Sequence, residues 1–467
     1  MYTTDPISRN RRFWPLALCA LTLLALVARV YYVRTAVVDH PIRGDAALYY
    51  AYALNLNLHG VFSKEAPGTE TVAADSYRDP GYPVFLSAWM KLFGWAEAWY
   101  AAVLLSQALL GALTVTLAAQ LGRYWLAPEW AAGAGLLMAV WPHSITINGY
   151  LLSETLFGFL CALGMLLCAR ACRYANPWWA MAAGLVLGAA AMTNAVLQPF
   201  GILMAGVLAW RKLAPRKICV ALAVGALVLP GAWAIRNTQV SNVGADNSSK
   251  DRALFTFVVG AWPDYGAAWH ASLSADAAQK ANAAATLHMA DKEYAALQAS
   301  PMEGAKMILR RFSEHPGRYA VWYLFEKPFE LWNWNIQIGQ GDIYVYPTTN
   351  APFQVNPAWI ALAAICHALN WLLLLLALAS LFFVWTKRRW VDGGGKQGSR
   401  AALVGVICLL AFATLVYTLL QAEPRYSIAF RPFEILLAVT ALAGITVWGR
   451  NADLFPAGRS AKPSAKA

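Results

Sequence analysis

The sequence has little charge and little histidine for its length. Of its 467 residues, 13% are Asp, Glu, Lys or Arg and seven are histidine, whereas 59% are hydrophobic. A soluble globular domain carries roughly a quarter charged residues. The scarcity of charge excludes an ordinary soluble protein. Because apolar runs longer than about 18 residues recur, the sequence predicts an all-α polytopic membrane protein.

Cysteine is absent from the two long polar segments, because all seven cysteines lie in apolar runs. We therefore expect no disulfides, even on an oxidising outer side of the membrane. Cys168 and Cys172 stand four residues apart with no histidine or third cysteine beside them, which favours core packing over a metal site. His59 and His143 are lone histidines near helix ends. We assign no metal to them.

Ten apolar runs predict ten transmembrane helices, with both termini on the same side. The inner segments then contain an excess of Lys and Arg and few acids. This is the positive-inside pattern, which makes that side cytoplasmic and gives the net charge of +12 an explanation without nucleic acid. The expected spans are about 13–32, 97–122, 130–147, 151–171, 177–194, 195–210, 218–235, 358–385, 401–420 and 428–448.

The first apolar run follows a basic stretch, Arg9 to Arg12, and a signal peptide is the alternative interpretation. The run is long for a signal peptide, so we expect a retained helix. The outer segments would face the periplasm of a bacterial cell inner membrane. The expected parts are an N-terminal transmembrane module (1–236) with a first periplasmic loop (33–95), a periplasmic or interfacial region (237–357), C-terminal transmembrane helices (358–450) and a disordered cytoplasmic tail (451–467).

The region 237–357 is the least hydrophobic part of the chain. Residues 275–299 predict an exposed helix, and Ser300-Pro301-Met302-Glu303 is a capping box that begins a second one. Residues 318–334 alternate charged and aromatic side chains, which predicts an amphipathic helix at the level of the lipid headgroups.

Asp45 in the first loop directly precedes a tyrosine-rich helical run, Ala46 to Leu54. As a helix N-cap it would need no further explanation. It also lies just beyond the first span, where a lipid headgroup would sit, and a helix N-terminus keeps a carboxylate ionised. We interpret it as a candidate reactive carboxylate.

Other candidates lie at the same membrane face, each with a structural alternative. Glu154 begins the fourth span, where the helix dipole favours an acid. Arg78 and Asp79 could be a surface pair. Arg236 and Arg425 lie at outer helix ends, where arginines often snorkel, although guanidinium also binds phosphate bidentately. By contrast, Glu434 lies inside the last span three residues after Arg431, which predicts a structural ion pair.

The ordered set of motifs resembles the GT-C glycosyltransferases. It is most similar to the bacterial family 39 type, related to protein O-mannosyltransferases and the aminoarabinose transferase of lipid A. The resemblance covers nearly the whole chain. Its motifs are Gly44-Asp45, Gly60, Arg78-Asp79-Pro80-Gly81-Tyr82-Pro83, Ser153-Glu154, Arg236-Asn237, His315-Pro316 with Lys327, and Glu423-Pro424-Arg425-Tyr426.

The resemblance implies an inverting transfer of a sugar from a polyprenyl-phosphate carrier. Asp45 would be the catalytic base, and Glu154 would orient the acceptor or a divalent metal ion, the only cofactor considered. Such a leaving group needs little protonation, so the site must supply a base and positive charge. The implied phosphate-binding residues are Arg78, Arg236 and Arg425, and the implied substrate-binding residues are Arg43, Tyr49, Asp79, Tyr82 and Tyr426.

Two other functions stay open from the sequence. An O-antigen ligase or polymerase would use a lipid-diphosphate donor and an arginine-rich outer loop, but residues 237–357 are mixed in charge. A lipid-sugar flippase would be expected to show internal repeats or buried charges in mid-membrane helices, and we find no repeat. The acceptor could be a glycolipid, a polysaccharide or a protein.

Overall fold

The computed structural model describes residues 6–95, 97–240, 248–272, 276–334, 346–386 and 397–452, and these are almost entirely helical. The first half contains α1 (Pro6–Thr35), β1 (Val37–Val38), α2 (Asp45–Leu58), α3 (Gly81–Phe93), α4 (Glu97–Gly122), α5 (Pro128–Val140), α6 (Pro142–Thr146), η1 (Ile147–Gly149), α7 (Glu154–Tyr174), α8 (Pro177–Thr193), η2 (Ala195–Leu197), α9 (Phe200–Trp210) and α10 (Arg216–Thr238). The second half contains α11 (Ser249–Gly260), α12 (Tyr265–Ser272), α13 (Ala277–Ala299), α14 (Pro301–Glu314), α15 (Pro316–Val321), η3 (Trp322–Glu326), α16 (Lys327–Leu331), β2 (Thr348–Thr349), α17 (Pro352–Val355), α18 (Pro357–Thr386), α19 (Gln397–Leu419), η4 (Pro424–Phe430) and α20 (Arg431–Ala452).

Seven of the described helices are long and apolar enough to cross a membrane, and the protein is a multi-pass membrane protein. They lie in α1, α4, α7, α10, α18, α19 and η4–α20. Three predicted spans are shorter in the structure: α5 is interrupted at Trp141 before Pro142, and α8 and α9 have 17 and 11 residues. The all-α class is confirmed, whereas the number of ten crossings stays a prediction.

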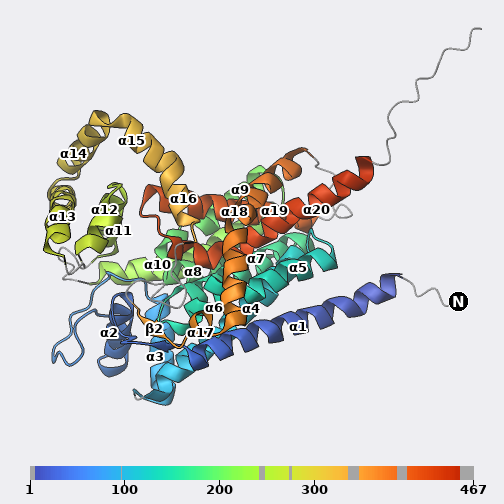
Figure 1. Cartoon of the computed structure of the whole chain (residues 1–467), viewed down its shortest axis with the longest axis horizontal. Helices are drawn as coiled ribbons and strands as arrows, with labels where there is room; N and C mark the ends of the chain where they lie inside the picture. Colours follow the sequence, from blue (N-terminus) through green and yellow to red (C-terminus); the bar gives the residue numbers. More distant parts are fainter. Residues whose placement is uncertain are drawn as a thin grey trace, which may run out of the picture.

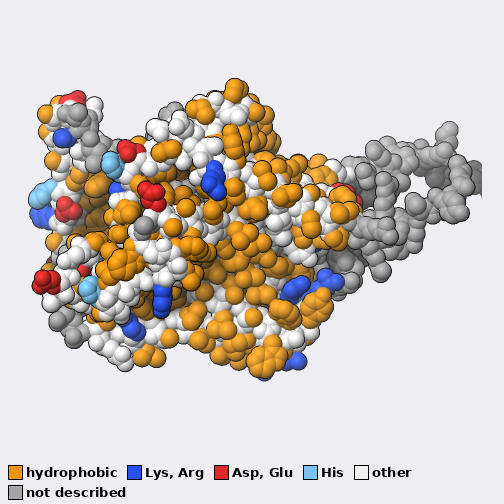
Figure 2. Space-filling view, turned by 90° about the horizontal axis from the view of Figure 1, so that it is seen from below, with side chains coloured by type: hydrophobic (Ala, Val, Ile, Leu, Met, Phe, Trp, Pro, Cys, Tyr) orange, Lys and Arg blue, Asp and Glu red, His pale blue; other side chains and the backbone are white. Residues whose placement is uncertain are grey.

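The helices place their polar connections at one end of the molecule. The beginning of α1 and the end of α20 point toward the opposite end from α2, α3 and α11 to α14 (Figure 1). Side chains of Lys, Arg, Asp and Glu gather toward this connecting end, and the middle of the face seen in Figure 2 is mostly hydrophobic. This distribution is the one expected of a bundle that lies in lipid with one elaborated polar end.

Small residues let the central helices approach closely. A Cβ on Gly184 of α8 would lie 2.3 Å from the Leu222 carbonyl oxygen of α10, and one on Gly225 would lie 2.5 Å from the Met181 carbonyl oxygen. In a membrane, helix association depends on such packing because lipid tails are as apolar as the side chains. The glycines therefore fix the α8–α10 pair.

The first loop folds into two short helices, and the first of them, α2, contains the run predicted from Ala46 to Leu54. Gly60 after α2 and Gly94 after α3 have φ of 67° and 75°, a region that glycine adopts without strain. The antiparallel pairing of Val37 with Thr349 joins this loop to the end of the second polar region. Residues far apart in sequence thus meet beside the membrane end of α1.

In the second polar region, α13 and α14 confirm the predicted helices, and the Ser300 hydroxyl accepts a hydrogen bond from the Glu303 N–H. The helix predicted over 318–334 is present as a continuous helical segment from Pro316 to Leu331, made of α15, the π-helical η3 and α16. Residues 453–467 of the predicted tail lie outside the described residues.

Candidate active site

A cavity of about 1870 Å³ opens between the first loop, α11–α12, η3–α16 and the ends of α18, α19 and η4. One part of its wall is polar and contains Asp45, Arg78, Glu154, Glu423 and Arg425. The other part is aromatic and aliphatic. The polar residues thus come from segments up to 380 residues apart.

A tyrosine from the far end of the chain fixes the turn that presents Asp45. The Tyr346 hydroxyl donates to the Arg43 carbonyl oxygen (2.7 Å) and accepts from the Ala46 N–H (3.1 Å). Between these two residues Gly44 has φ of 55°, which favours glycine. The turn holds Asp45 as the first residue of α2.

Asp45 is not the N-cap of α2, and the capping interpretation is wrong. Gly44 occupies the cap position, and no side chain caps this helix. The Asp45 carboxylate instead forms two ion pairs: Oδ1 lies 2.6 Å from Arg78 Nη2, and Oδ2 lies 2.7 Å from Arg425 Nη2. A third pair joins Arg425 Nε to Glu154 Oε1 at 3.0 Å. These four residues form the cavity cluster (Asp45, Arg78, Glu154 and Arg425).

Charge dominates the protonation state of this cluster. Burial alone would raise the pKa of the Asp45 carboxyl, but the guanidinium groups of Arg78 and Arg425 lower it, so the pKa lies well below its ordinary value. Burial alone would lower the pKa of the Arg78 guanidinium. The Asp45 carboxylate has the larger, opposite effect, so the pKa of Arg78 lies above its ordinary value and the group stays charged. Asp45 is therefore an ionised counter-charge at neutral pH.

The arginines of the cluster are partly open to the cavity. Arg78 and Arg425 both line it, with 15% and 16% of their side chains exposed. The Arg78 guanidinium carbon lies 5.4 Å from the centre of the Tyr49 ring, which orients it along the cavity wall. Guanidinium groups present a planar fork that matches phosphate oxygens. The cluster can accordingly bind an oxyanion.

A second ion pair closes the neighbouring wall. Asp79 Oδ2 lies 2.7 Å from Arg252 Nη2 of α11 and accepts from the Ala195 N–H at 3.2 Å. The pair ties the first loop both to η2 and to α11. Since all three residues line the cavity, the contact fixes its shape on this side.

The apolar part of the cavity lies between α16, α18 and α19. Trp334 stacks near His367 of α18, with 5.3 Å between ring centres, and Phe329 stacks on Trp371 at 3.9 Å. Further apolar lining comes from Phe325, Phe353, Ala363, Ala364, Val416 and Leu420. An apolar channel beside a polar cluster suits a molecule with a hydrocarbon tail and a charged head.

The structure separates the predicted site residues into two sets. Those that line the cavity are Asp45, Tyr49, Arg78, Asp79, Glu154, Arg425 and Tyr426. Arg43 is exposed and outside the described lining. Tyr82 is buried in a separate hydrophobic cluster, with its hydroxyl 2.8 Å from Gln107 Oε1. Arg236 Nη1 donates to the Asp75 carbonyl oxygen (2.6 Å), so it supports the first loop from outside the cavity lining.

Sequence reasoning missed Arg252 and Tyr346 and gave Glu423 no role. Glu423 was within reach, because it begins the Glu-Pro-Arg-Tyr motif that supplied Arg425 and Tyr426. Arg252 and Tyr346 carry no local signal, since their roles come from contacts across 173 and about 300 residues. The described residues contain no group of three or more His, Cys, Asp or Glu side chains placed to hold a metal ion. The metal considered from the sequence stays a hypothesis.

No protein-family model and no curated protein matches this chain. Solved structures of an oligosaccharyltransferase from Archaeoglobus fulgidus do match. The apo form has 13% identity and a TM-score of 0.50, with 95% of this chain and 52% of that chain covered. The form tethered to an acceptor peptide with the sequence NVT has 14% identity and a TM-score of 0.50, covering 95% and 50%. A third, with an inhibitory peptide and a dolichol-phosphate, has 12% identity and a TM-score of 0.49, covering 96% and 53%.

The chain has the GT-C fold. It spans about half the length of the solved GT-C structures that it matches. At this level of identity the likeness concerns the fold alone. The assignment to family 39 within the GT-C enzymes stays a prediction from the sequence motifs.

Proposed function

We propose that this protein is a glycosyltransferase that moves a sugar from a polyprenyl-phosphate carrier to an acceptor at the outer face of a bacterial inner membrane. The observation that supports it is the cavity cluster, in which Arg78 and Arg425 converge on Asp45 beside an apolar channel. The donor has the matching chemistry, a phosphate head on a hydrocarbon tail. The GT-C fold agrees with this proposal.

In the proposed reaction, the isoprenoid chain lies in the apolar part of the cavity and its phosphate contacts Arg78 and Arg425. The acceptor attacks the anomeric carbon as the bond to the phosphate oxygen breaks. Negative charge then grows on the phosphate, and two fixed guanidinium groups stabilise it without reorganisation. Asp45 holds both arginines in place. For Asp45 to act also as the base, one arginine must first leave its carboxylate.

The outward orientation rests on charge and on the fold. The predicted inner segments hold the basic excess. The first loop and α11–α12, which line the cavity, lie at the end of the bundle away from the beginning of α1 and the end of α20 (Figure 1). Transfer would therefore follow the flipping of the lipid-linked sugar. The acceptor class is left open by the proposal.

A turnover assay on the full chain tests the proposal. Purified protein in lipid nanodiscs is given a panel of radiolabelled polyprenyl-phosphate hexoses and pentoses, and release of polyprenyl phosphate is measured with water or added glycolipid as acceptor. We expect release with at least one donor and a loss of about 10²–10³-fold in Asp45→Asn, since its two arginines lose their anchor.

An exposed arginine supplies the matched control. Arg310→Gln on α14 should keep full turnover, because its side chain is 83% exposed and pairs only with Glu314 at the surface. If the protein in vesicles moves the labelled lipid from one leaflet to the other and releases no polyprenyl phosphate, the proposal is contradicted and a flippase is indicated. Turnover only with diphosphate-linked donors would indicate the ligase class.

A further inference from the structure

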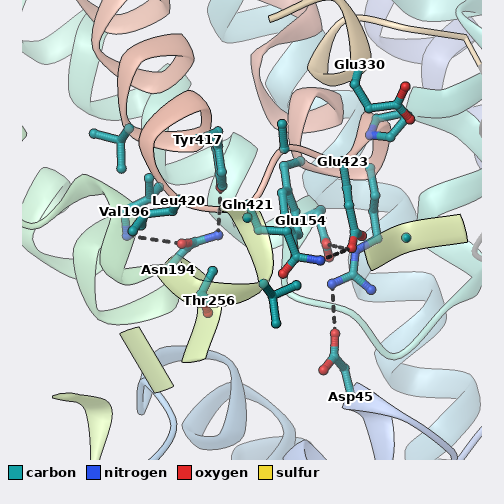
Figure 3. A pocket seen from close by; sticks show the side chains of 18 of the residues that line it. Asp45, Glu154, Asn194, Val196, Thr256, Glu330, Tyr417, Leu420, Gln421 and Glu423 are labelled. Carbon is teal, nitrogen blue, oxygen red and sulfur yellow. Dashed lines mark hydrogen bonds and ion pairs between the residues drawn. The ribbon is translucent and has the colours of Figure 1, made fainter. Parts of the chain in front are cut away.

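Two carboxylates in the cavity, Asp45 and Glu423, differ in whether they form ion pairs with arginine. Each oxygen of Asp45 is paired with an arginine nitrogen, at 2.6 and 2.7 Å. Glu423 lines the same cavity, and the described residues place no Lys or Arg nitrogen within 4 Å of its carboxylate. Its Oε1 accepts a hydrogen bond from the Gln421 side-chain amide. In Figure 3, Glu423 lies beside Gln421, and Asp45 is drawn below them in the view.

We propose that Glu423 is the base that accepts the proton of the acceptor nucleophile, whereas Asp45 positions Arg78 and Arg425. This inference rests on the proposed glycosyl transfer. It gives a catalytic role to Glu423, which had no role in the sequence analysis, and a positioning role to Asp45.

The step balances as follows. The acceptor O–H transfers its proton to the Glu423 carboxylate as its oxygen bonds to the anomeric carbon. The bond from that carbon to the phosphate oxygen breaks, and its electron pair leaves with the polyprenyl phosphate. The protonated Glu423 then returns its proton to water in the cavity. An inverting transfer needs base and leaving group on opposite faces of the sugar, so the sugar must lie with one face toward Glu423 and the phosphate toward Arg78.

Basicity supports the same assignment. Burial raises the pKa of the Glu423 carboxyl above its ordinary value, although Arg425 acts in the opposite direction. The other charged or titratable groups near it are Asp45, Glu154 and Glu330 from three different elements, and Tyr426 beside it. A base works best when its pKa approaches the working pH. Asp45, with its lowered pKa, is the weaker base of the two.

Glu154 is the less suitable carboxylate on geometric grounds. Its side chain is 7% exposed, and its Oε1 lies 3.0 Å from Arg425 Nε. An acceptor hydroxyl must come within about 2.6–3.2 Å of the base. Glu423 lines the cavity, is more exposed than Glu154 and has no arginine within ion-pair distance among the described residues, whereas Glu154 is paired with Arg425.

Two measurements on the full chain separate the roles. The first is binding of bare geranylgeranyl phosphate, which probes the arginines without a sugar. The second is turnover of the labelled polyprenyl-phosphate sugars. Glu423→Gln should bind geranylgeranyl phosphate within about threefold of the wild type and lose about 10²–10⁴-fold in kcat. Asp45→Asn should lose binding of the bare lipid about tenfold or more, because its arginines are released.

Conservative replacement and pH distinguish a base from a structural residue. Glu423→Asp should restore part of the turnover lost in Glu423→Gln. A base is active when deprotonated, so wild-type kcat should fall as pH falls through the raised pKa of Glu423, at a higher pH than for an ordinary glutamate. Glu423→Gln should lose this limb. Glu326→Gln, an exposed rim carboxylate paired with Arg318, is the control and should keep the wild-type profile.

Each outcome decides the inference. Turnover of Glu423→Gln within threefold of the wild type overturns it, and so does loss of geranylgeranyl phosphate binding in that variant with its fold intact. If Glu423→Gln does not fold, the pH profile of kcat for Glu423→Asp is measured instead. A fall in kcat at the same pH as in the wild type overturns the assignment. A wild type that neither binds the bare lipid nor turns over any donor refutes the proposed function itself, which is a different result.

Discussion

Two arginine–carboxylate clusters lie on the same segment of the chain, and their surroundings differ. The cavity cluster contains Arg425 of η4, which is 16% exposed in its side chain and faces open space. The bundle cluster (Arg431, Glu434 and Asn370) begins at the next helix, α20, and its ion pair at 2.9 Å is 1–2% exposed. The sequence-predicted pairing of Arg431 with Glu434 is confirmed.

The partners of the two arginines explain the difference. Arg431 donates to Asn370 Oδ1 and to the carbonyl oxygens of Trp332 and Asn333, each at 3.0 Å, as well as to Glu434. It joins α16, α18 and α20 inside the bundle and does not line the cavity. Among the described residues, the ion-pair partners of Arg425 are the carboxylates of Asp45 and Glu154, and these can share it with a ligand. Burial with backbone partners marks a structural cluster, and exposure to a cavity marks a binding one.

The largest effect should come from breaking the bundle cluster. Arg431→Met leaves the Glu434 carboxylate buried without its cation, which typically costs about 3–5 kcal/mol of unfolding free energy. Denaturant unfolding in detergent micelles measures it. Binding of geranylgeranyl phosphate by the fraction that stays folded should be unchanged. A stable variant with lost lipid binding would remove the distinction between the clusters.

Breaking the cavity cluster should have the converse effect. Arg425→Gln removes a charged donor from the phosphate site, and we expect turnover to fall about 10²–10³-fold, as when an oxyanion donor is removed. Its unfolding free energy should change less than that of Arg431→Met, because the site is open to water. A binding titration with geranylgeranyl phosphate should show the same weakening, and unimpaired binding would contradict the assignment.

A smaller effect is expected where an ion pair shapes the cavity. Arg252→Met frees the Asp79 carboxylate, so α11 loses its ion pair to the first loop and keeps the backbone bridge between Ser248 and Ser76. We expect about 2 kcal/mol less protection of α11 amides in hydrogen exchange and a severalfold rise in KM. Unchanged exchange in α11 would show that the pair does not fix this wall.

The smallest functional effect should come from Arg236, which the sequence predicted to bind phosphate. Its guanidinium contacts the carbonyl oxygens of Asp75 and Phe62 and lies outside the cavity lining. Arg236→Lys should alter the affinity for geranylgeranyl phosphate by less than about threefold and lower stability by about 1 kcal/mol. A tenfold loss of affinity with the melting temperature unchanged would return Arg236 to the phosphate site.

The sequence predicts the helical elements well because their signals are local. Apolar runs, the Gly60 and Gly94 breaks and the cap at Ser300 all depend on neighbouring residues, and the structure has each of them. The predicted spans that came out short contain proline, as at Pro142, which the apolar pattern does not register. The helix predicted over 318–334 is present up to Leu331, but its aromatic spacing does not reveal the π-helical stretch of η3.

The candidate site could be predicted only in its individual residues. Position after the first span indicated Asp45, and the Glu-Pro-Arg-Tyr motif indicated Arg425, but no local pattern shows that their side chains pair across the fold. For the same reason Arg236 and Tyr82 resembled site residues although they support the loop and the core. Which polar groups share a cavity is a tertiary property, and no sequence pattern reports it.

The most direct measurement is a structure of the protein in nanodiscs with geranylgeranyl phosphate added, determined by electron cryo-microscopy. The account predicts lipid density in the channel between α16, α18 and α19, with phosphate oxygens within hydrogen-bond distance of both Arg78 and Arg425. A phosphate bound elsewhere, with both arginines still paired only to Asp45 and Glu154, would contradict it.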